Sequence, residues 1–239
     1  MIGRGEVIIF LGPPGAGKGT QAGRLASTLG IPAISTGEML REECRSGSEL
    51  GKVVAGVIAS GKLVSDELVN KIVASRLARA DCRTGCILDG YPRTVRQARF
   101  LDRFLESQGL ASPTVIHLDV NCQEILARLS KRRQCVKCGK IFRFESALTG
   151  GSLLCDVDGE LLAERVDDSP AVVQHRLTVY ARNAAPLVRY YTNGNYHRIH
   201  AAREPEEVSE EILAVLAAAE PAHRMMGSRR LAYATGLQA

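Results

Sequence analysis

The sequence contains no tryptophan, and aromatic residues make up only 5% of its 239 positions. Its apolar runs are shorter than the roughly 20 residues that a membrane-spanning helix needs, and its first residues do not resemble a signal peptide. It also lacks a block of Lys and Arg, because the formal net charge of +5 comes from basic residues spread along the chain. We therefore expect neither a membrane partner nor a nucleic-acid partner, since nucleic-acid sites concentrate their basic residues.

Cysteine is too scarce for a disulfide scaffold in a chain of this length, and the seven cysteines cannot pair completely because their number is odd. The overall composition, 45% hydrophobic and 24% charged, is that of a globular protein. A chain of this length is large enough to bury a core. We expect a reduced, cytoplasmic protein that forms one domain, with or without inserted parts.

Short apolar runs alternate with helical patterns along most of the chain. Apolar and β-branched runs predict strands at residues 6–12, 86–89, 114–120 and 196–199. Helical spacing predicts helices at residues 18–29, 66–80, 94–108, 121–133, 171–189 and 205–219. The alternation favours an α/β fold with a parallel sheet flanked by helices.

Two segments break this alternation. Residues 36–62 are almost entirely helical in pattern and contain several glycines, whereas residues 134–168 hold three cysteines and show little helical period. We interpret both as insertions on the α/β core. Residues 220–239 have no clear pattern, and we expect a loose C-terminal extension there.

A glycine-rich loop, Gly-Pro-Pro-Gly-Ala-Gly-Lys-Gly-Thr at residues 12–20, joins the first expected strand to the first expected helix. Glycines let the backbone curl so that successive N–H groups face inward, and the following helix adds the positive end of its dipole. Lys18 adds a positive charge for the β- and γ-phosphates of a nucleotide. The residues predicted to bind phosphate are Gly15, Ala16, Gly17, Lys18, Gly19 and Thr20.

This loop departs from the general Walker A pattern, because Gly19 follows the lysine and Thr20 comes one place later. In this form it resembles the loop of the nucleoside monophosphate kinases. Four further blocks, in the same order as in that family, extend the resemblance to the adenylate kinases over about residues 6–219: Ile34–Arg41, Gly61–Val64, Leu88–Arg93 and Arg165–Asp168.

The resemblance implies a three-part P-loop kinase and a function. The three parts are a core (residues 1–34, 65–131 and 169–219), an AMP-binding insertion (35–64) and a lid (132–168), and the extension (220–239) follows them. The implied reaction is reversible, Mg-dependent transfer of a phosphoryl group from ATP to AMP, giving two ADP, by a monomer. A UMP or CMP acceptor and a GTP donor stay open as alternatives, as does a nucleotide-gated or zinc-dependent regulatory protein, which would lack the second phosphate site.

Arginines, rather than a nucleophile, are expected to carry this chemistry. The acceptor phosphate is largely ionised at neutral pH, so it needs positioning and charge stabilisation instead of a general base. The resemblance implies that Arg41, Arg93 and Arg176 hold the AMP phosphate or the transferred group. It implies that Arg128, Arg132 and Arg165 approach the ATP phosphates from the other side. The expected catalytic set is Lys18, Arg93, Arg132, Arg165 and Arg176.

The resemblance also implies which residues form the two nucleotide pockets. The AMP pocket comprises Thr36, Arg41, Lys62, Leu63, Val64, Gly90, Tyr91, Pro92, Arg93, Gln97, Arg165 and Arg176. The Gln97 amide can both donate and accept, as adenine requires. The ATP pocket, beyond the loop, comprises Arg128, Arg132, Ile141, Phe142 and Arg203. The chain has His200-Ala201 where the family usually has Asp-Gly, which leaves the choice of donor base open.

Two metal sites are expected. Cys135-Val-Lys-Cys138-Gly has the spacing of a zinc knuckle, and Cys155-Asp-Val-Asp158 repeats it, so Cys135, Cys138, Cys155 and Asp158 can form a tetrahedral zinc site. Asp156 would break the spacing. We expect a structural zinc, because a segment this small cannot hold itself together without one. Unliganded thiols are the alternative. By resemblance, Asp89 would hold Mg²⁺ through water, and Asp167 and Asp168 would act at the lid hinge.

Overall fold

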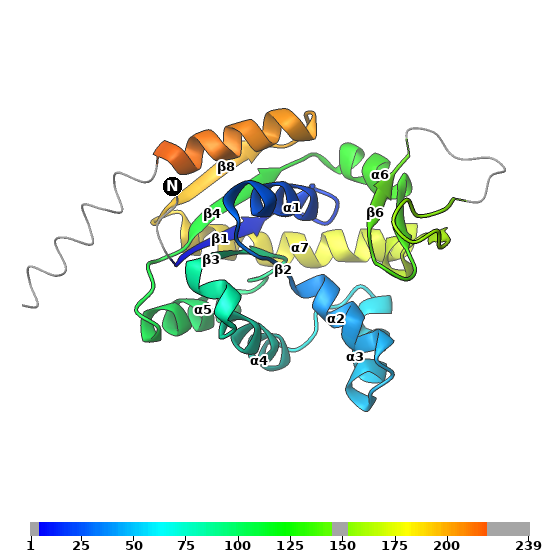
Figure 1. The fold of residues 1–239 in the computed structure, drawn as a ribbon, viewed down its shortest axis with the longest axis horizontal. Helices are drawn as coiled ribbons and strands as arrows, with labels where there is room; N and C mark the ends of the chain where they lie inside the picture. The colour runs from blue at the N-terminus through cyan, green and yellow to red at the C-terminus, as the bar shows by residue number, and fades with distance from the viewer. Residues whose placement is uncertain (1–4, 145–152, 219–239) are drawn as a thin grey trace, which may run out of the picture.

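A parallel five-stranded sheet forms the centre of the protein in the computed structural model, which describes residues 5–144 and 153–218. The strands follow the order β2 (Ala33–Ser35), β3 (Gly85–Asp89), β1 (Glu6–Leu11), β4 (Thr114–Asp119) and β8 (Tyr196–His200). Every neighbouring pair is parallel. The expected α/β fold is therefore confirmed, and Figure 1 shows the helices packed on both faces of this sheet.

The alternation of side chains in β1 explains why both faces are covered. Ile8 and Phe10 belong to one core cluster, with α1, α6 and the helix over residues 205–218. Val7, Ile9 and Leu11 belong to a second cluster, with α4, α5 and the C-terminal part of α7. Successive side chains of a strand point to opposite faces, so a strand that is apolar throughout needs cover on both sides.

Seven numbered helices surround the sheet or extend from it: α1 (Lys18–Leu29), α2 (Thr36–Arg45), α3 (Glu49–Ala59), α4 (Asp66–Leu77), α5 (Val95–Ser107), α6 (Cys122–Ser130) and α7 (Pro170–Tyr191). Several begin at a residue whose side-chain oxygen accepts a backbone N–H of the first turn, which stabilises the helix start. These capping residues are Ser35, Ser48, Ser65, Thr94 and Asn121. Among the described helices, none is long and apolar enough to cross a lipid bilayer.

The structure differs in several details from the sequence prediction. The helix expected over residues 121–133 ends at Ser130, because Arg132 pairs with Arg143 in an antiparallel strand. Strand β2 was not predicted, since three residues are too short to show a period of two. The helical segment 36–62 is divided into α2 and α3 by a turn at residues 46–48.

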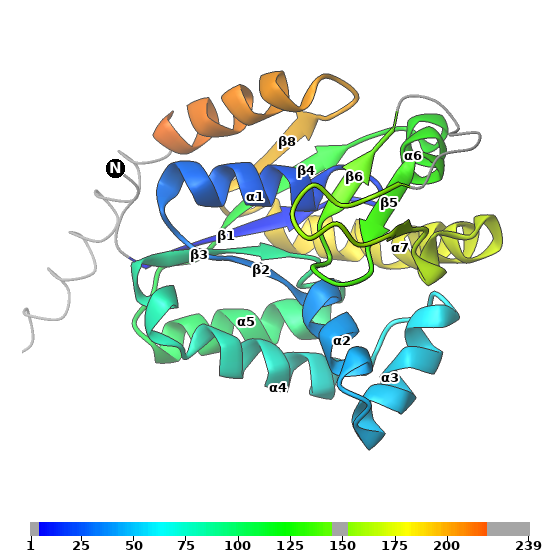
Figure 2. The same ribbon diagram turned by 45° about the vertical axis from the view of Figure 1, so that its right-hand side comes forward.

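A second, three-stranded antiparallel sheet lies in the segment expected to be the lid. Its order is β6 (Ile141–Arg143), β5 (Arg132–Cys135) and β7 (Leu162–Ala163). Among the described residues of this segment, three buried side chains form its hydrophobic core: Cys135, Cys155 and Leu162. Figures 1 and 2 show this sheet, α2 and α3 near the end of the large sheet where the strand arrows point, around the start of α7.

Helix α3 packs so closely on α2 that Gly51 leaves no room for a side chain. A Cβ on Gly51 would lie 2.2 Å from the backbone oxygen of Glu43. We expect Gly51→Ala to lower the free energy of unfolding by roughly 1–3 kcal/mol, since backbone must move to accept the methyl group. Gly56→Ala in the same helix is the control, because nothing lies within 4 Å of its Cβ position, and it should be neutral or slightly stabilising. Equal melting curves for the two variants would contradict this account of the packing.

Candidate active site

The loop at residues 12–17 presents its backbone to the end of the sheet. Gly12, Gly15 and Gly17 have φ angles of 141°, 82° and 95°, which a residue with a Cβ rarely adopts. Helix α1 begins directly after Gly17, and no side chain caps it. The first N–H groups of a helix have no partner within that helix, so these remain available to an anion, and the helix dipole favours one there.

The ammonium group of Lys18 lies under this loop. Its Nζ donates to the backbone oxygens of Gly12 and Pro13 at 2.9 and 2.8 Å. Burial lowers the pKa of Lys18 to about 8; Asp89 opposes this shift, and the nearby Arg93 and Arg176 reinforce it. A cation held among other cations lacks a partner, and a polyanionic ligand would supply one.

Arg93 and Arg176 line the same cleft as Lys18, from the loop after β3 and from α7 respectively. The Nε of Arg93 donates to the backbone oxygen of Gly90 at 2.8 Å. Burial and the nearby Arg176 lower the pKa of Arg93, although its guanidinium faces the solvent of the cleft. The cleft encloses about 730 Å³, including its open part, and is also lined by Gly12, Pro14, Gly61, Leu63, Gly90 and Pro92.

Two adjacent carboxylates hold the arginines in place. Asp168 accepts from Arg132 Nε at 2.7 Å and from Arg176 at 3.1 Å. Asp167 pairs with Arg176 at 3.0 Å. Burial works to raise the pKa of Asp167, but the surrounding guanidiniums, Arg176 foremost, outweigh it and lower the pKa. Asp167 and Asp168 lie where the segment expected to be the lid meets α7. Their ion pairs connect that segment with α7.

Arg165 completes the cationic cluster. Burial, with Arg41 and Arg132 nearby, lowers the pKa of Arg165 to about 10. Its Nε donates to the side-chain oxygen of Gln134 at 2.8 Å. The structure therefore brings Lys18 and five of the predicted arginines to one place: Arg41, Arg93, Arg132, Arg165 and Arg176.

The other two predicted arginines lie beside the loop after β8. Arg128 pairs with Glu124 at 2.6 Å and donates to the backbone oxygen of Ala201 at 2.8 Å. Its Nη1 would lie 3.9 Å from a Cβ on Gly17, so it borders the glycine loop. Arg203 forms an ion pair with Glu211 and donates to the backbone oxygen of His200 at 3.1 Å.

The predicted acceptor pocket contains an internal hydrogen-bond network. Gln97 is only 2% exposed, and its amide donates to Asp66 at 2.8 Å and accepts from the Arg93 backbone at 2.7 Å. Thr36 donates to the backbone oxygen of Gly90 at 2.9 Å. One further N–H and one lone pair remain on the Gln97 amide. Gln97 thus also fixes the loop that carries Arg93.

The other predicted acceptor residues lie around this network. Tyr91 is fully buried, and its hydroxyl donates to Asn70 at 2.7 Å. Lys62 is exposed, whereas Leu63 and Val64 are half-buried. Sequence reasoning did not find Asn70 or Asp66, since their roles depend on contacts between segments far apart in the chain. The only local signal was the position of Asp66 in the first turn of a capped helix.

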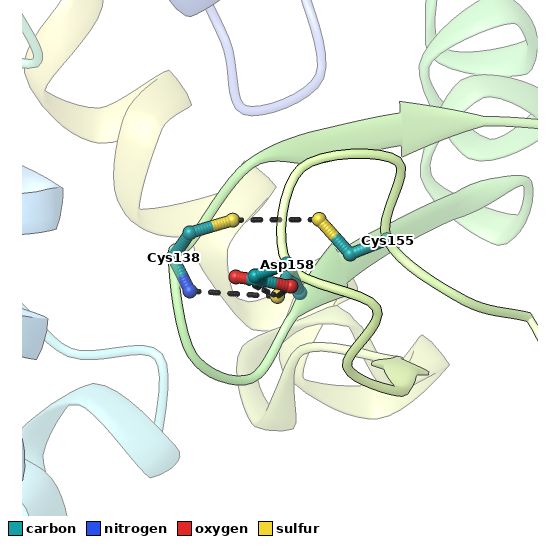
Figure 3. A group of neighbouring side chains, drawn as sticks. Cys138, Cys155 and Asp158 are labelled. Atoms are coloured by element: carbon teal, nitrogen blue, oxygen red, sulfur yellow. Dashed lines mark hydrogen bonds between the residues drawn. The ribbon is translucent and has the colours of Figure 1, made fainter.

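The four expected zinc ligands converge. The ligand atoms of Cys135, Cys138, Cys155 and Asp158 all lie within 4.8 Å of one another. Figure 3 shows Cys138, Cys155 and Asp158 facing one another from two loops, with 3.6 Å between the sulfur atoms of the two cysteines. Zinc–sulfur bonds of about 2.3 Å at tetrahedral angles place sulfurs about 3.8 Å apart. The donor set and its spacing therefore fit zinc.

Backbone groups around the cluster also suit thiolates. The N–H groups of Lys137 and Cys138 point at the Cys135 sulfur, each at 3.4 Å. Asp156 instead binds Lys140 at 2.7 Å, which leaves Asp158 as the carboxylate of the cluster. The two loops thus present their ligands as the paired spacing predicts.

Asp89 ends β3 beside the glycine loop. A Cβ on Gly19 would lie 3.2 Å from its Oδ2, so a serine or threonine at position 19 would crowd this carboxylate. A carboxylate at this point, next to a phosphate-binding loop, has the hard oxygen donors that Mg²⁺ prefers. The position fits a magnesium ion that keeps its waters.

A phosphate-binding loop at the end of a parallel sheet, faced by a cluster of arginines under a small second sheet, defines a P-loop kinase that acts on phosphorylated acceptors. The sequence model of the family described as adenylate kinase matches residues 10–196, and the chain belongs to that family. It is a nucleoside monophosphate kinase, and the family transfers a phosphoryl group between ATP and AMP.

Several curated relatives carry the name of this family, and the chain matches nearly all of their length. An adenylate kinase of Thermosipho africanus is 44% identical over 210 residues, covering 87% of this chain and 98% of the relative. One from Kosmotoga olearia is 45% identical over 206 residues, covering 86% and 96%. One from Thermotoga neapolitana is 43% identical over 211 residues, covering 87% and 96%. The predicted resemblance is therefore confirmed.

Proposed function

We propose that this kinase works by neutralising two nucleotides in one cleft, with Mg-ATP as donor and AMP as acceptor. The observation that supports this most directly is a convergence of cations: Arg93 and Arg176 help to lower the pKa of Lys18, and Arg132 and Arg176 share the carboxylate of Asp168. Two polyanions repel each other strongly unless cations lie between them. Charge stabilisation and alignment then account for most of the rate of phosphoryl transfer.

On the donor side, the loop N–H groups from Gly15 to Thr20 bind the β- and γ-phosphates of ATP, with Lys18 beneath them. Arg128 and Arg132 approach from the other side, and Ile141, Phe142 and Arg203 border the base. Asp89, beside Gly19 of the loop, would hold a magnesium ion. When bound, that ion neutralises charge on the transferring group. Lys18 and Arg132 remain on that group during transfer, which stabilises its negative charge.

On the acceptor side, Arg41, Arg93 and Arg176 hold the AMP phosphate in line with the donor, and Arg165 contacts this phosphate as well as those of ATP. A guanidinium binds two phosphate oxygens at once, so these contacts orient the attacking oxygen as well as neutralising it. The adenine is recognised by Thr36, Lys62, Leu63, Val64, Gly90, Tyr91, Pro92 and Gln97.

We divide the chain as the resemblance implies: a core (1–34, 65–131 and 169–219), an AMP-binding insertion (35–64), a lid (132–168) and an extension (220–239). Residues 1–4, 145–152 and 219–239 fall outside the described part. The insertion and the lid close over the substrates and exclude water, which would otherwise accept the phosphoryl group. A structural zinc held by Cys135, Cys138, Cys155 and Asp158 stabilises the lid. We further propose a monomer in the reducing cytoplasm, without a nucleic-acid partner.

The decisive experiment is ADP formation from ATP and AMP with Mg²⁺, together with a zinc determination on the same sample. We expect AMP to outperform UMP and CMP as acceptor, and ATP to outperform GTP as donor. A dinucleotide of two adenosines joined by five phosphates should bind far more tightly than ATP, because it fills both sites. Equal binding of that compound and ATP would mean that the acceptor site is absent.

The lowered pKa of Lys18 predicts a pH dependence. The free enzyme loses the positive charge of Lys18 as pH rises through about 8, so kcat/KM for ATP should fall above that pH, since this ratio reports the free enzyme. Bound phosphates favour the charged form, so kcat should hold to higher pH. In Lys18→Arg, which stays charged, this inflection should disappear. A kcat/KM profile that stays flat up to about pH 10 in the native enzyme would contradict this.

A further inference from the structure

Gln134 in β5 makes contacts that the proposed chemistry does not use. Its side chain is buried, and its Nε2 donates to the backbone oxygen of Gly139 at 2.8 Å and reaches Glu38 Oε2 at 3.4 Å. Its Oε1 accepts from Arg165 Nε at 2.8 Å. The partners fix the orientation of the amide, because a carbonyl and a carboxylate only accept and a guanidinium only donates.

The three partners belong to different parts of the molecule. Gly139 closes the hairpin at residues 135–139, which carries the first two expected zinc ligands; we name it the knuckle hairpin. Arg165 lies at the end of the lid segment. Glu38 lies on α2 of the insertion, where it pairs with Arg41 at 3.0 Å and with Arg45 at 2.9 Å. One amide thus joins the lid hairpin, a cleft arginine and the insertion.

The knuckle hairpin is shaped for this approach. Gly139 has a φ of 75°, and a Cβ on it would lie 3.2 Å from Glu38 Oε1 and 3.4 Å from Gln134 Nε2. A side chain there would be strained and would push Glu38 and Gln134 away. The glycine therefore serves the contact between lid and insertion, besides closing the turn.

We propose that Gln134 is a positioning residue that holds Arg165 toward the substrate phosphates and ties the lid to Glu38 of the insertion. The proposal rests on the roles proposed above for Arg41 and Arg165. A neutral amide suits both tasks. Its oxygen fixes the guanidinium of Arg165 through Nε, so that the two Nη groups can face phosphate. The amide also contacts Glu38 without displacing Arg41, since an N–H adds a donor and no competing charge.

The test begins with two isosteric variants. Gln134→Met removes every hydrogen bond, and we expect kcat to fall about tenfold, the rate equivalent of about 1.4 kcal/mol, because Arg165 is no longer aligned. Gln134→Glu keeps the acceptor for Arg165 but loses the donor to Gly139 and places a carboxylate against Glu38. It should therefore raise KM for AMP about tenfold with kcat largely kept. Gln174→Met, at an exposed position on α7, is the control and should match the native enzyme.

Repeating the test in an enzyme that already carries Glu38→Gln isolates the contact between residues 134 and 38. In Glu38→Gln, the amide can donate to a carboxylate at position 134, so the effect of Gln134→Glu on KM for AMP should shrink from about tenfold to less than about threefold. Zinc content and melting temperature are measured on every variant. A purely structural residue would not produce this split between kcat and KM or this dependence on position 38.

Three results would overturn the proposal. The first is native kinetics in Gln134→Met, and the second is an equal effect of Gln134→Glu in the native and Glu38→Gln backgrounds. The third is a Gln134 variant that loses zinc but has the native rate for each chain that still carries zinc. Arg165→Lys separates this from the proposed function. If Arg165→Lys is impaired while the Gln134 variants are fully active, only the inference about Gln134 is wrong. If Arg165→Lys is also fully active, the proposed role of Arg165 is wrong.

Discussion

Lys18→Met is expected to lower kcat about 1,000-fold, the largest effect of any single substitution considered for this protein. Methionine has nearly the length of lysine but no charge, so the loop keeps its shape while the transferring phosphoryl group loses its central cation. The Lys18 ammonium uses two of its three donors for the loop oxygens of Gly12 and Pro13, and we expect the third to reach the substrate. The measurement is steady-state ADP formation at saturating ATP and AMP.

The fold should survive this change. Burial lowers the pKa of Lys18, which means that the folded protein disfavours its charge. Methionine removes that cost, so the melting temperature should stay equal or rise. Lys71→Met, on the exposed side of α4, is the matched control and should retain full activity. Turnover of Lys18→Met within tenfold of the native enzyme would refute the role of the loop.

Removing zinc is expected to unfold the lid before the core. In the described part of the small sheet and its loops, three buried side chains form the hydrophobic core, and burial on that scale cannot offset the entropy of ordering the segment. A structural zinc couples its binding energy to folding. Chelation, or Cys138→Ser, should lower the melting temperature by roughly 10 °C, since a loss of several kcal/mol shifts a domain of this size by that amount.

Hydrogen exchange locates the effect. After chelation, the amides of β5 and β6 should exchange rapidly, while those of β1 and β4 in the large sheet stay protected. Cys122→Ser, at an exposed cysteine on α6, should bind the same amount of zinc as the native protein, close to one per chain. An unchanged melting curve with no bound zinc would mean that the cluster consists of ordinary thiols.

Features encoded within a few residues could be read from the sequence. The glycine loop and the paired Cys-x-x-Cys and Cys-x-x-Asp spacings depend on neighbours, and the structure brings their residues together as expected. The parallel sheet followed from the alternation of apolar runs with helical patterns. These signals are strong because each records a local geometric requirement of the backbone or of a metal.

Contacts between segments far apart in the chain could not be predicted from the sequence. Gln97 meets Asp66, and Gln134 meets Glu38, across separations of 31 and 96 residues. A single glutamine in a sequence gives no sign of which carboxylate it will reach. The end of α6 at Ser130 was likewise decided by the pairing of Arg132 with Arg143, a tertiary choice that outweighs local helical preference.

The placement of Asp168 has a consequence for turnover. Its carboxylate, 3% exposed, binds Arg132 of the lid and Arg176 of the core helix at once. In the resting enzyme it acts as a resident counterion, which lets the fold tolerate guanidiniums so close together. A departing product therefore leaves behind cations that already have a substitute anion. Given the phosphate-binding roles proposed above for Arg132 and Arg176, we expect that substitute to weaken the binding of ADP and so to speed the release of product.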